Sequence, residues 1–291
     1  MTIPSELKKN EIYPAYITGY TSEGAGVCRI GERAVFVPGT IALEEWDVRI
    51  VRSTSAAVWG RGETLRAPSP HRTEPDCTVY PRCGGCALRH MDYEEELSLK
   101  LQRVNDALHR IGKLTFSVSG ILPAPENARQ RRKVIFNVAE QNGRPVAGFY
   151  RARSHDVVPV PDCPAVPKAA VACARTVLDW MERERVPVYD EAAKRGGVRH
   201  IFYRSSHLTE KAVLTLTASR SPGEKSLGVL ADMLRERCPD VTGLVLNRNT
   251  ARGNTVLAGD FDTVWGSEVL TEGLCGLTFT LSPRSFFQVN P

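Results

Sequence analysis

Three cysteines within ten residues are the clearest chemical signal in the sequence. Cys77, Cys83 and Cys86 follow the pattern C-x5-C-x2-C, whereas the other five of the eight cysteines are scattered along the chain. Cysteine thiolates bind zinc and iron–sulfur clusters, so these three residues predict one face of a metal site. Gly84 and Gly85 favour an iron–sulfur cluster, because a backbone without side chains can fold tightly and direct its N–H groups at sulfur atoms.

A fourth ligand is expected from a separate part of the chain. Cys163 is the best candidate, because Pro161 and Pro164 near it predict a rigid, exposed loop. Structural zinc remains open as the alternative, since a site of four cysteines with one C-x2-C pair also suits that metal. The C-x3-C-x2-C pattern of radical enzymes does not fit, because the first gap here is five residues.

Basic side chains gather in two segments, although the formal net charge of the whole chain is only +5. The first segment contains one acidic residue, Glu140, and seven basic ones: Arg129, Arg131, Arg132, Lys133, Arg144, Arg151 and Arg153. The second segment contains Lys194, Arg195, Arg199, His200 and Arg204. Clustered arginine neutralises phosphate, so both segments are candidate RNA or DNA contacts, with a solvated basic face as the alternative.

Short strands separated by turns dominate the first sixty-odd residues. Strands are predicted at 12–17, 27–30, 34–37, 47–52 and 55–59. Five short strands favour a small closed barrel of the OB type. The G-x-G pairs at 24–26 and 60–62 are interpreted as hairpin glycines, because neither pair lies between a strand and a helix as a nucleotide fingerprint would.

Helices and strands alternate in the remainder of the chain. Apolar residues recur at helical spacing over 92–111, with Asp92 as N-cap and Gly112 as stop, and further helices are predicted at 168–184 and 224–237. Strands are predicted at 132–138 and 146–150 around Asn142-Gly143, at 198–203, 212–218 and 242–247, and within 255–288. No strand–Gly-rich turn–helix unit is recognised.

Length and composition bound the kind of protein. A chain of 291 residues can form two domains, and 42% hydrophobic with 24% charged residues is ordinary for a globular protein. No apolar run approaches the roughly 18 residues of a membrane span, and the N-terminus lacks the apolar core of a secretory signal. We therefore expect a soluble, cytoplasmic protein with no membrane partner.

Several separate motifs resemble the bacterial RNA uracil-5-methyltransferases. They occur in the family's order along essentially the whole chain, at 68–77, 83–90, 148–151 with 154–156, 162–164 and 285–290. Residues 23–27 and 35–39 resemble that family's TRAM domain, an OB-like RNA-binding barrel. The resemblance favours a substrate in 23S ribosomal RNA, because members that act on transfer RNA typically lack the barrel and the cysteine motif; transfer RNA remains the alternative substrate.

The resemblance also implies roles for particular residues. Gln288 is expected to contact S-adenosylmethionine. A [4Fe-4S] cluster that shapes the RNA-binding region is expected on Cys77, Cys83, Cys86 and Cys163. The clustered charge described above, and not the resemblance, is the reason to expect RNA contacts from Arg129, Arg131, Arg132, Lys133, Arg151 and Arg153. Arg89 departs from the family, which usually carries glutamine at that position, but the change affects no expected ligand.

The family's reaction requires a nucleophile that this chain is not expected to contain. A cysteine thiolate adds to uracil C6, C5 takes the methyl group from the sulfonium, and a general base removes the C5 proton. In the family, the nucleophile, the base and a Rossmann-like domain follow the motif at 285–290. Because the sequence ends at Pro291, we expect no catalytic residue here and a C-terminally truncated, inactive RNA-binding portion of the enzyme.

The expected fold class is α+β, with the Rossmann-like methyltransferase domain mostly absent. The expected division is 1–66 for the OB-like barrel, 67–91 for the cysteine cluster, 92–124 for a helix and linker that pack on the catalytic domain, 125–282 for a mixed α/β RNA-binding domain, and 283–291 for the start of the methyltransferase domain. The chain is expected to be a monomer. A stand-alone RNA-binding module without catalysis and a zinc-stabilised RNA-binding protein remain as alternatives.

Overall fold

The chain forms two compact units. The computed structural model describes residues 7–251, 253 and 255–290, so the first six residues of the predicted barrel segment and Pro291 lie outside the described residues. One unit consists of 1–81 with 86–125, and the other of 82–85 with 126–291. Each unit is described by itself below.

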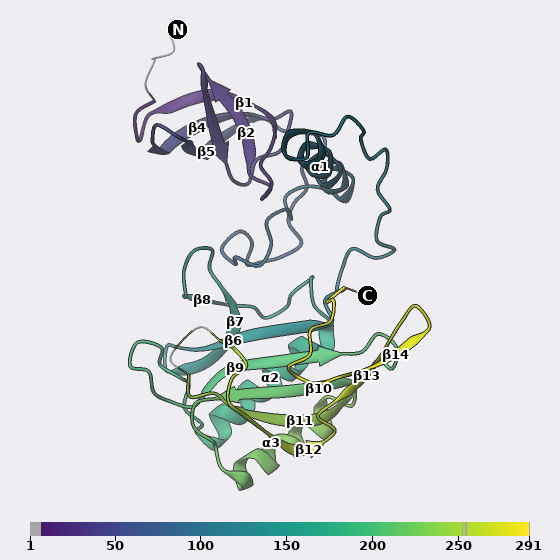
Figure 1. Ribbon diagram of the computed structural model, residues 1–291. Coiled ribbons are helices and arrows are strands. Elements are labelled where there is room, and N and C mark those ends of the chain that lie inside the picture. The colour runs from purple at the N-terminus through teal and green to yellow at the C-terminus, as the bar shows by residue number, and fades with distance from the viewer. Residues whose placement is uncertain (1–6, 252, 254, 291) are drawn as a thin grey trace. The chain divides into compact units, whose positions relative to one another are not determined.

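Five strands of the first unit form the closed barrel that the sequence predicted, in the order β1–β2–β3–β5–β4 (Figure 1). The strands are β1 (Ile12–Tyr20), β2 (Gly26–Ile30), β3 (Arg33–Val37), β4 (Glu45–Ser53) and β5 (Val58–Ala67). Fully buried side chains such as Ile17, Cys28 and Val48 fill the barrel. Closure pairs every strand with two neighbours and leaves no open sheet edge.

The prediction of hairpin glycines at 60–62 was wrong. Gly60 and Gly62 both lie within β5. A side-chain carbon at Gly60 would meet Val48 Cγ1 at 2.3 Å inside the barrel, so glycine is required there by close packing and not by a turn.

A single long helix follows the barrel in the first unit. It runs as α1 (Tyr93–Asp106) and continues as the π-helical turn η1 (Ala107–Ile111). As predicted, Asp92 caps the helix, because its Oδ1 accepts a hydrogen bond from the backbone N of Glu95 at 2.9 Å. The chain leaves the helix at Gly112, which was the predicted stop.

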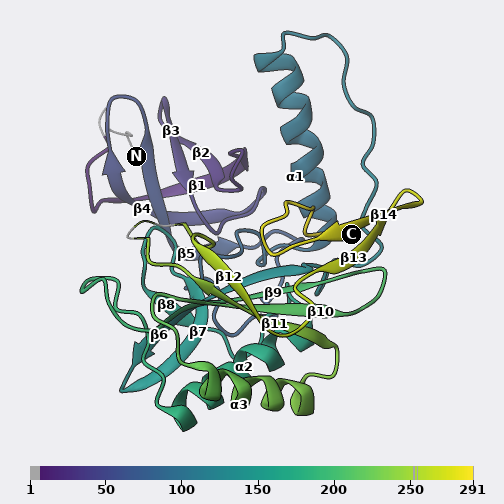
Figure 2. The same cartoon turned by 60° about the horizontal axis from the view of Figure 1, so that its bottom comes forward.

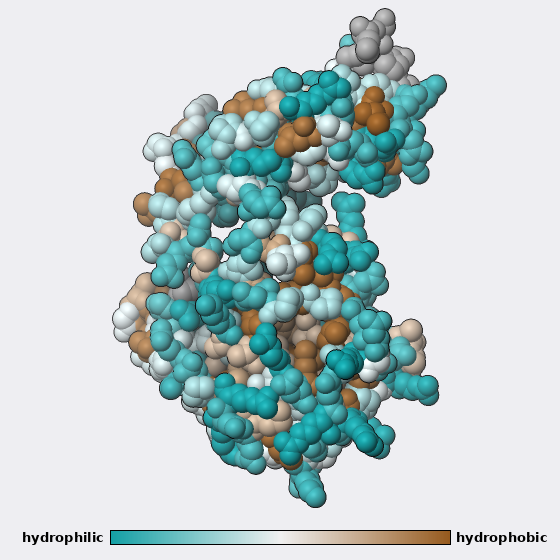
Figure 3. All heavy atoms as spheres, turned by 180° about the vertical axis from the view of Figure 1, so that it is seen from behind, coloured by the Kyte–Doolittle hydropathy of each residue, from teal (hydrophilic) through white to brown (hydrophobic). Residues whose placement is uncertain are grey.

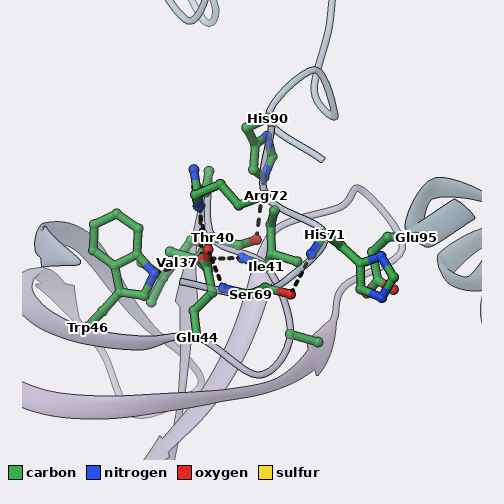
Figure 4. A network of polar contacts seen from close by, with 12 residues as sticks. Val37, Thr40, Ile41, Glu44, Trp46, Ser69, His71, Arg72, His90 and Glu95 are labelled. Atoms are coloured by element: carbon green, nitrogen blue, oxygen red, sulfur yellow. Dashed lines mark hydrogen bonds and ion pairs between the residues drawn. The ribbon is translucent and has the colours of Figure 1, made fainter. Parts of the chain in front are cut away.

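A buried carboxylate ties the barrel to the segment that follows it (Figure 4). Glu44 is inaccessible to solvent, and it accepts hydrogen bonds at 2.8 Å from the backbone N of Ile41 and from Trp46 Nε1. The guanidinium of Arg72 pairs with the same carboxylate, with Nη2 at 2.8 Å. Burial alone would raise the pKa of Glu44, but these donors outweigh burial and hold the pKa below its usual value.

The second unit is built on one seven-stranded sheet in the order β12–β11–β10–β9–β6–β7–β8. Its strands are β6 (Lys133–Gln141), β7 (Arg144–Tyr150), β8 (Val157–Pro159), β9 (Val198–Ser205), β10 (Ala212–Ala218), β11 (Val241–Arg248) and β12 (Asp260–Gly266). A separate hairpin pairs β13 (Leu270–Leu274) with β14 (Leu277–Leu281).

Two helices, α2 (Lys168–Glu184) and α3 (Glu224–Arg237), cover one face of this sheet (Figure 2). Both occupy the predicted ranges. They pack against each other, with α2 against β7 and β9 and α3 against β11 and β12. The predicted turn between β6 and β7 is also confirmed, because Asn142 and Gly143 both have positive φ, at 53° and 74°.

The sheet of the second unit contains one feature that the sequence analysis did not recognise. Strands β10 and β11 are parallel and are joined through α3, which makes a βαβ unit, the building element of Rossmann-type sheets. The sequence analysis recognised no such unit, because the turn before α3 carries one glycine, Gly223, and no Gly-rich loop. Parallel pairing is a long-range contact, and the spacing of apolar residues does not reveal it.

The surface combines polar residues with exposed large hydrophobic ones such as Ile111, Leu122 and Phe286. On the face drawn in Figure 3, apolar residues form separate patches among hydrophilic ones. Within the described residues, no helix combines the length and the apolar character needed to cross a lipid bilayer.

We predict that Glu44→Ala lowers the free energy of unfolding by about 3 kcal/mol, because it leaves the Arg72 charge without its buried partner. Urea unfolding monitored by the fluorescence of Trp46 and the other tryptophans measures the change. Glu63→Ala is the matched control, because Glu63 pairs with Arg49 and Arg61 at the surface and its loss should leave the unfolding midpoint unchanged. Equal effects of the two substitutions would contradict the assignment.

The Glu44 network also predicts a pH dependence. Because the pKa of Glu44 is lower in the folded state than in the unfolded chain, its stabilisation is present above the ordinary carboxyl pKa of about 4.3 and is lost as the pH falls through the folded-state value. The stability difference between the natural chain and Glu44→Gln should therefore shrink below about pH 4. A stability difference that grows on acidification would show that folding raises the pKa of Glu44 and does not lower it.

Candidate functional site

A pocket of about 510 Å³ in the second unit brings together residues that the sequence analysis assigned separately. Arg132 and Lys133 from the start of β6 line it together with Gln288. We call it the Gln288 pocket. The remaining lining includes Arg204, Ser205, His207, Phe286, Phe287, Asn290 and residues of the β13–β14 hairpin.

The segment 282–290 contains no helix or strand, and besides a turn between Ser282 and Ser285 its backbone groups are bonded by other parts of the unit. Arg204 supplies two donors: Nη1 donates to the carbonyl of Ser282 at 2.8 Å and Nη2 donates to that of Ser285 at 2.6 Å. The backbone N of Arg132 donates to the carbonyl of Val289 at 2.7 Å. These bonds fix the segment that carries Gln288 beside β6 and β9.

Arg204 is 5% exposed, and burial lowers the pKa of its guanidinium. The sequence analysis included Arg204 in a basic segment, but its structural role depends on backbone carbonyls that are nearly eighty residues away in sequence. No local pattern could have shown this role.

Lys133 and the aromatic residues give the pocket both charge and flat apolar surface. Lys133 Nζ lies 6.0 Å from the ring centroid of Phe286, which is 80% exposed. Burial lowers the pKa of Lys133, and the nearby Arg204 charge lowers it further. A cation beside an exposed ring can contact a phosphate and an unstacked base at the same time.

Glu272 was missed by the sequence analysis. Its carboxylate is 4% exposed and accepts hydrogen bonds from the backbone N of His207 at 2.8 Å and of Leu208 at 3.0 Å. Burial would raise the pKa of Glu272, but these backbone donors outweigh it and the pKa is lowered. Glu272 thereby shapes the turn that holds the His207 ring, with Nδ1 3.2 Å from Arg132 Nη2.

The other predicted RNA contacts lie in different environments. Arg129 forms an ion pair with Asp162, with Nη2 2.8 Å from Oδ2, and also donates to the carbonyl of Cys163 at 3.3 Å, so it braces the Cys163 loop. Arg131 is exposed. Arg151 and Arg153 are exposed as well, and Arg151 forms an isolated β-bridge with Cys83.

The four predicted cysteine ligands divide between the two units. Cys77 and Cys86 belong to the first unit, and Cys83 and Cys163 belong to the second. In the parts of the chain that the structure describes, no three His, Cys, Asp or Glu side chains converge to hold a metal ion. The structure therefore leaves the predicted metal site without a demonstrated ligand group.

Local features around these sulfur atoms do suit thiolates. The backbone N of Gly85 donates to Cys83 Sγ at 3.4 Å, as the sequence analysis expected of the glycine pair. A side-chain carbon at Gly84 would lie 2.8 Å from the backbone N of Ala152, so only glycine fits this approach. In the first unit, the Arg89 guanidinium pairs with the carboxylate of Asp76, the residue before Cys77.

The curated relatives of this chain are RNA methyltransferases. The chain is 33% identical over 287 residues to an uncharacterized RNA methyltransferase of Clostridium tetani, an alignment that covers 98% of the chain and 62% of that protein. It is 31% identical to an uncharacterized RNA methyltransferase of Listeria innocua, over 99% of the chain and 63% of the relative. The chain thus spans somewhat less than two thirds of these relatives. No protein-family model matches it.

A solved structure shares the fold. The chain superposes with a TM-score of 0.74 on a tRNA (uracil-54, C5)-methyltransferase of Pyrococcus abyssi, whose structure was solved in complex with S-adenosyl-L-homocysteine. The two are 21% identical in sequence, and the match covers 95% of this chain and 61% of that one.

These alignments correct two predictions. The first is the fold class, which was predicted with the methyltransferase domain mostly absent. It is overturned, because 95% of the chain superposes on a methyltransferase chain. The prediction of a truncated, inactive fragment is corrected as well, because 98% of the chain aligns with RNA methyltransferases. That prediction depended on where the sequence ends, and the position of a last residue says nothing about the activity of a protein.

We predict that Arg204→Ala loosens the segment 282–290 and lowers the free energy of unfolding by about 2 kcal/mol, because two partly buried carbonyls lose a charged donor. Hydrogen exchange at the Arg132 amide, which is bonded to Val289, should accelerate. The matched control is Arg248→Ala, which removes an exposed ion pair with Asp262. If the Arg132 amide exchanges at the natural rate in Arg204→Ala, the anchoring role is wrong.

Proposed function

We propose that this chain belongs to the RNA uracil-5-methyltransferases and acts in the S-adenosylmethionine-dependent methylation of uridine C5, with 23S ribosomal RNA as substrate. The observation that carries the proposal is the alignment of 98% of the chain with RNA methyltransferases. The shared fold with a uracil C5 methyltransferase supports it. The barrel and the cysteine motif are the reasons for proposing a ribosomal substrate, because members of the family that act on transfer RNA typically lack both.

The Gln288 pocket is proposed to serve this reaction. Its volume of about 510 Å³ is in the range of small-molecule sites. Gln288 is exposed at the pocket, and its side-chain amide can both donate and accept hydrogen bonds toward S-adenosylmethionine. The cofactor supplies the methyl group when bound. Arg132 and Lys133 place positive charge beside the same pocket, where they can bind and orient the phosphates of the RNA.

Four cysteines, Cys77, Cys83, Cys86 and Cys163, are proposed to hold a [4Fe-4S] cluster. The donor set supports this, because four thiols suit such a cluster and the backbone N–H of Gly85 donates a hydrogen bond to the Cys83 sulfur. The cluster would organise the RNA-binding surface. We further propose that the protein acts in the cytoplasm as a monomer.

Methyl transfer tests the proposed function. The protein containing this chain is incubated with 23S or transfer RNA and methyl-labelled S-adenosylmethionine, and the nucleosides are separated by mass spectrometry. Labelled 5-methyluridine from 23S RNA is the expected product. Product from transfer RNA alone would overturn the ribosomal substrate, and no labelled 5-methyluridine from either RNA would overturn the proposed function.

Visible absorption tests the cluster. Protein purified without oxygen should be brown, and substitution of Cys86 by Ser should bleach it, whereas Cys275→Ser should leave the colour unchanged. Colourless protein that contains one equivalent of zinc would contradict the iron–sulfur assignment and favour the zinc alternative.

RNA binding tests the basic edge of the Gln288 pocket. We predict that Arg132→Ala combined with Lys133→Ala weakens binding and reduces the slope of log K against log salt concentration by about 1.5, since each lost phosphate contact removes about 0.7 to 0.9. Arg235→Ala with Arg248→Ala removes the same charge elsewhere and should leave the slope unchanged. Equal slopes in the two double variants would show that Arg132 and Lys133 belong to a solvated basic face and do not contact the RNA.

A further inference from the structure

A second pocket in the same unit has no role in the function proposed above. It has a volume of about 470 Å³ and shares no lining residue with the Gln288 pocket. It lies beside β6 and β9 and the segment 188–191, and we call it the Tyr189 pocket. The lining residues that matter here are Asn137, Glu140, Tyr150, Tyr189, Arg199 and His200.

Flat side chains form two walls of the Tyr189 pocket. The rings of Tyr150 and His155 stack with their centroids 4.9 Å apart and an interplanar angle of 16°. The guanidinium of Arg199 lies over the ring of Tyr189, 4.4 Å from its centroid. Stacked rings and guanidinium planes are the surfaces on which proteins receive unpaired bases.

One polar atom in the pocket has an unused hydrogen-bonding capacity. His200 Nδ1 is buried and has no hydrogen-bond partner within the described part of the chain. Burial and the Arg199 charge lower the pKa of His200 to about 4, so the ring is neutral near pH 7. Asn137 lies opposite His200 in the β6–β9 pair. A neutral imidazole beside an amide offers hydrogen bonds to a neutral ligand.

The guanidinium of Arg199 is already hydrogen-bonded within the protein. Arg199 is 8% exposed. It lies at a register shift between β9 and β10, an irregularity that changes the direction of a side chain relative to the regular strand. Its guanidinium donates to three backbone carbonyls at 2.7 to 3.2 Å, those of Asn249, Ala251 and Gly253. Arg199 therefore acts as a rigid planar surface and has few donors left for a phosphate.

Carboxylates complete the lining and decide which part of a nucleotide fits. Glu140, Asp190 and Glu191 line the pocket. Asp190 already accepts hydrogen bonds from two backbone N–H groups and Glu191 pairs with His155, so the proposal uses Glu140. Negative side chains repel phosphate, but they accept hydrogen bonds from the amino and imino groups of a base. Guanine presents two adjacent donors, N1–H and N2–H, to one carboxylate, whereas uracil presents two carbonyl oxygens and a single donor.

We infer that the Tyr189 pocket binds one unpaired guanine of the RNA, at a position other than the uridine to be methylated. The inference rests on the proposed function in so far as it takes RNA as the ligand. The base stacks on the Tyr189 and Tyr150 surfaces, and Glu140 reads its donor edge. The Tyr189 pocket thus reads a base outside the methylated uridine, and the Gln288 pocket does not.

Binding of two short single-stranded RNAs to the full chain tests the inference. Fluorescence anisotropy compares labelled UUGUU with labelled UUUUU. We expect UUGUU to bind about tenfold more tightly, the effect of one good bidentate contact. Tyr189→Ala and Glu140→Gln should each reduce the ratio to near one, whereas Tyr189→Phe keeps the ring and should keep the preference. Circular dichroism confirms that each variant is folded.

The possible outcomes separate this inference from the proposed function. Equal affinities for the two RNAs, or a guanine preference that survives both Tyr189→Ala and Glu140→Gln, overturn the inference. Arg132→Ala with Lys133→Ala should weaken both RNAs equally and leave the ratio intact; a lost ratio there would also overturn it. A guanine preference in a protein that transfers no methyl group would support the pocket and overturn only the proposed function.

Discussion

The buried guanidinium of Arg204 donates hydrogen bonds to the carbonyls of Ser282 and Ser285, and the position of the segment that follows depends on these two hydrogen bonds. Residues 282–290 form no regular structure that could satisfy their own backbone groups. Without the Arg204 donors, the exposed Phe286 and Gln288 would be held beside Lys133 mainly by the hydrogen bond from the backbone N of Arg132 to the carbonyl of Val289. The lining of the Gln288 pocket, which comes from distant segments, therefore depends in large part on one interior charge.

The same physical rule recurs elsewhere in the molecule. A charge buried in a protein must be surrounded by hydrogen bonds, and the bonds then fix the elements that supply them. Glu44 does this in the first unit through Arg72 and Trp46. Arg199 fixes a loop at the Tyr189 pocket in the same way, because its guanidinium donates to three loop carbonyls. In each case the interior charge organises a loop that apolar packing alone would leave undefined.

Local patterns in the sequence predicted most of the elements. The barrel strands, the Asp92 cap, both sheet-covering helices and the Asn142-Gly143 turn follow from spacing and turn chemistry between near neighbours. Long-range features did not follow. The parallel pairing of β10 with β11 and the close approach at Gly60 depend on residues far apart in sequence, and both were missed.

Prediction of the site shows the same division. Motifs singled out Gln288, Arg132 and Lys133 separately, and the structure places the three around one pocket. The anchors of that pocket, Arg204 and Glu272, act through backbone groups of distant segments, so residue type gave no indication of their roles.

Hydrogen exchange with S-adenosylhomocysteine and RNA added to the protein tests the central claim, that the Gln288 pocket is where this chain takes part in RNA methylation. We predict slower exchange at the amides of 286–290 and of Lys133 when the two ligands are present, and no change at the amides of α3. Unchanged exchange at 286–290 and Lys133, in protein that demonstrably binds both ligands, would contradict the account.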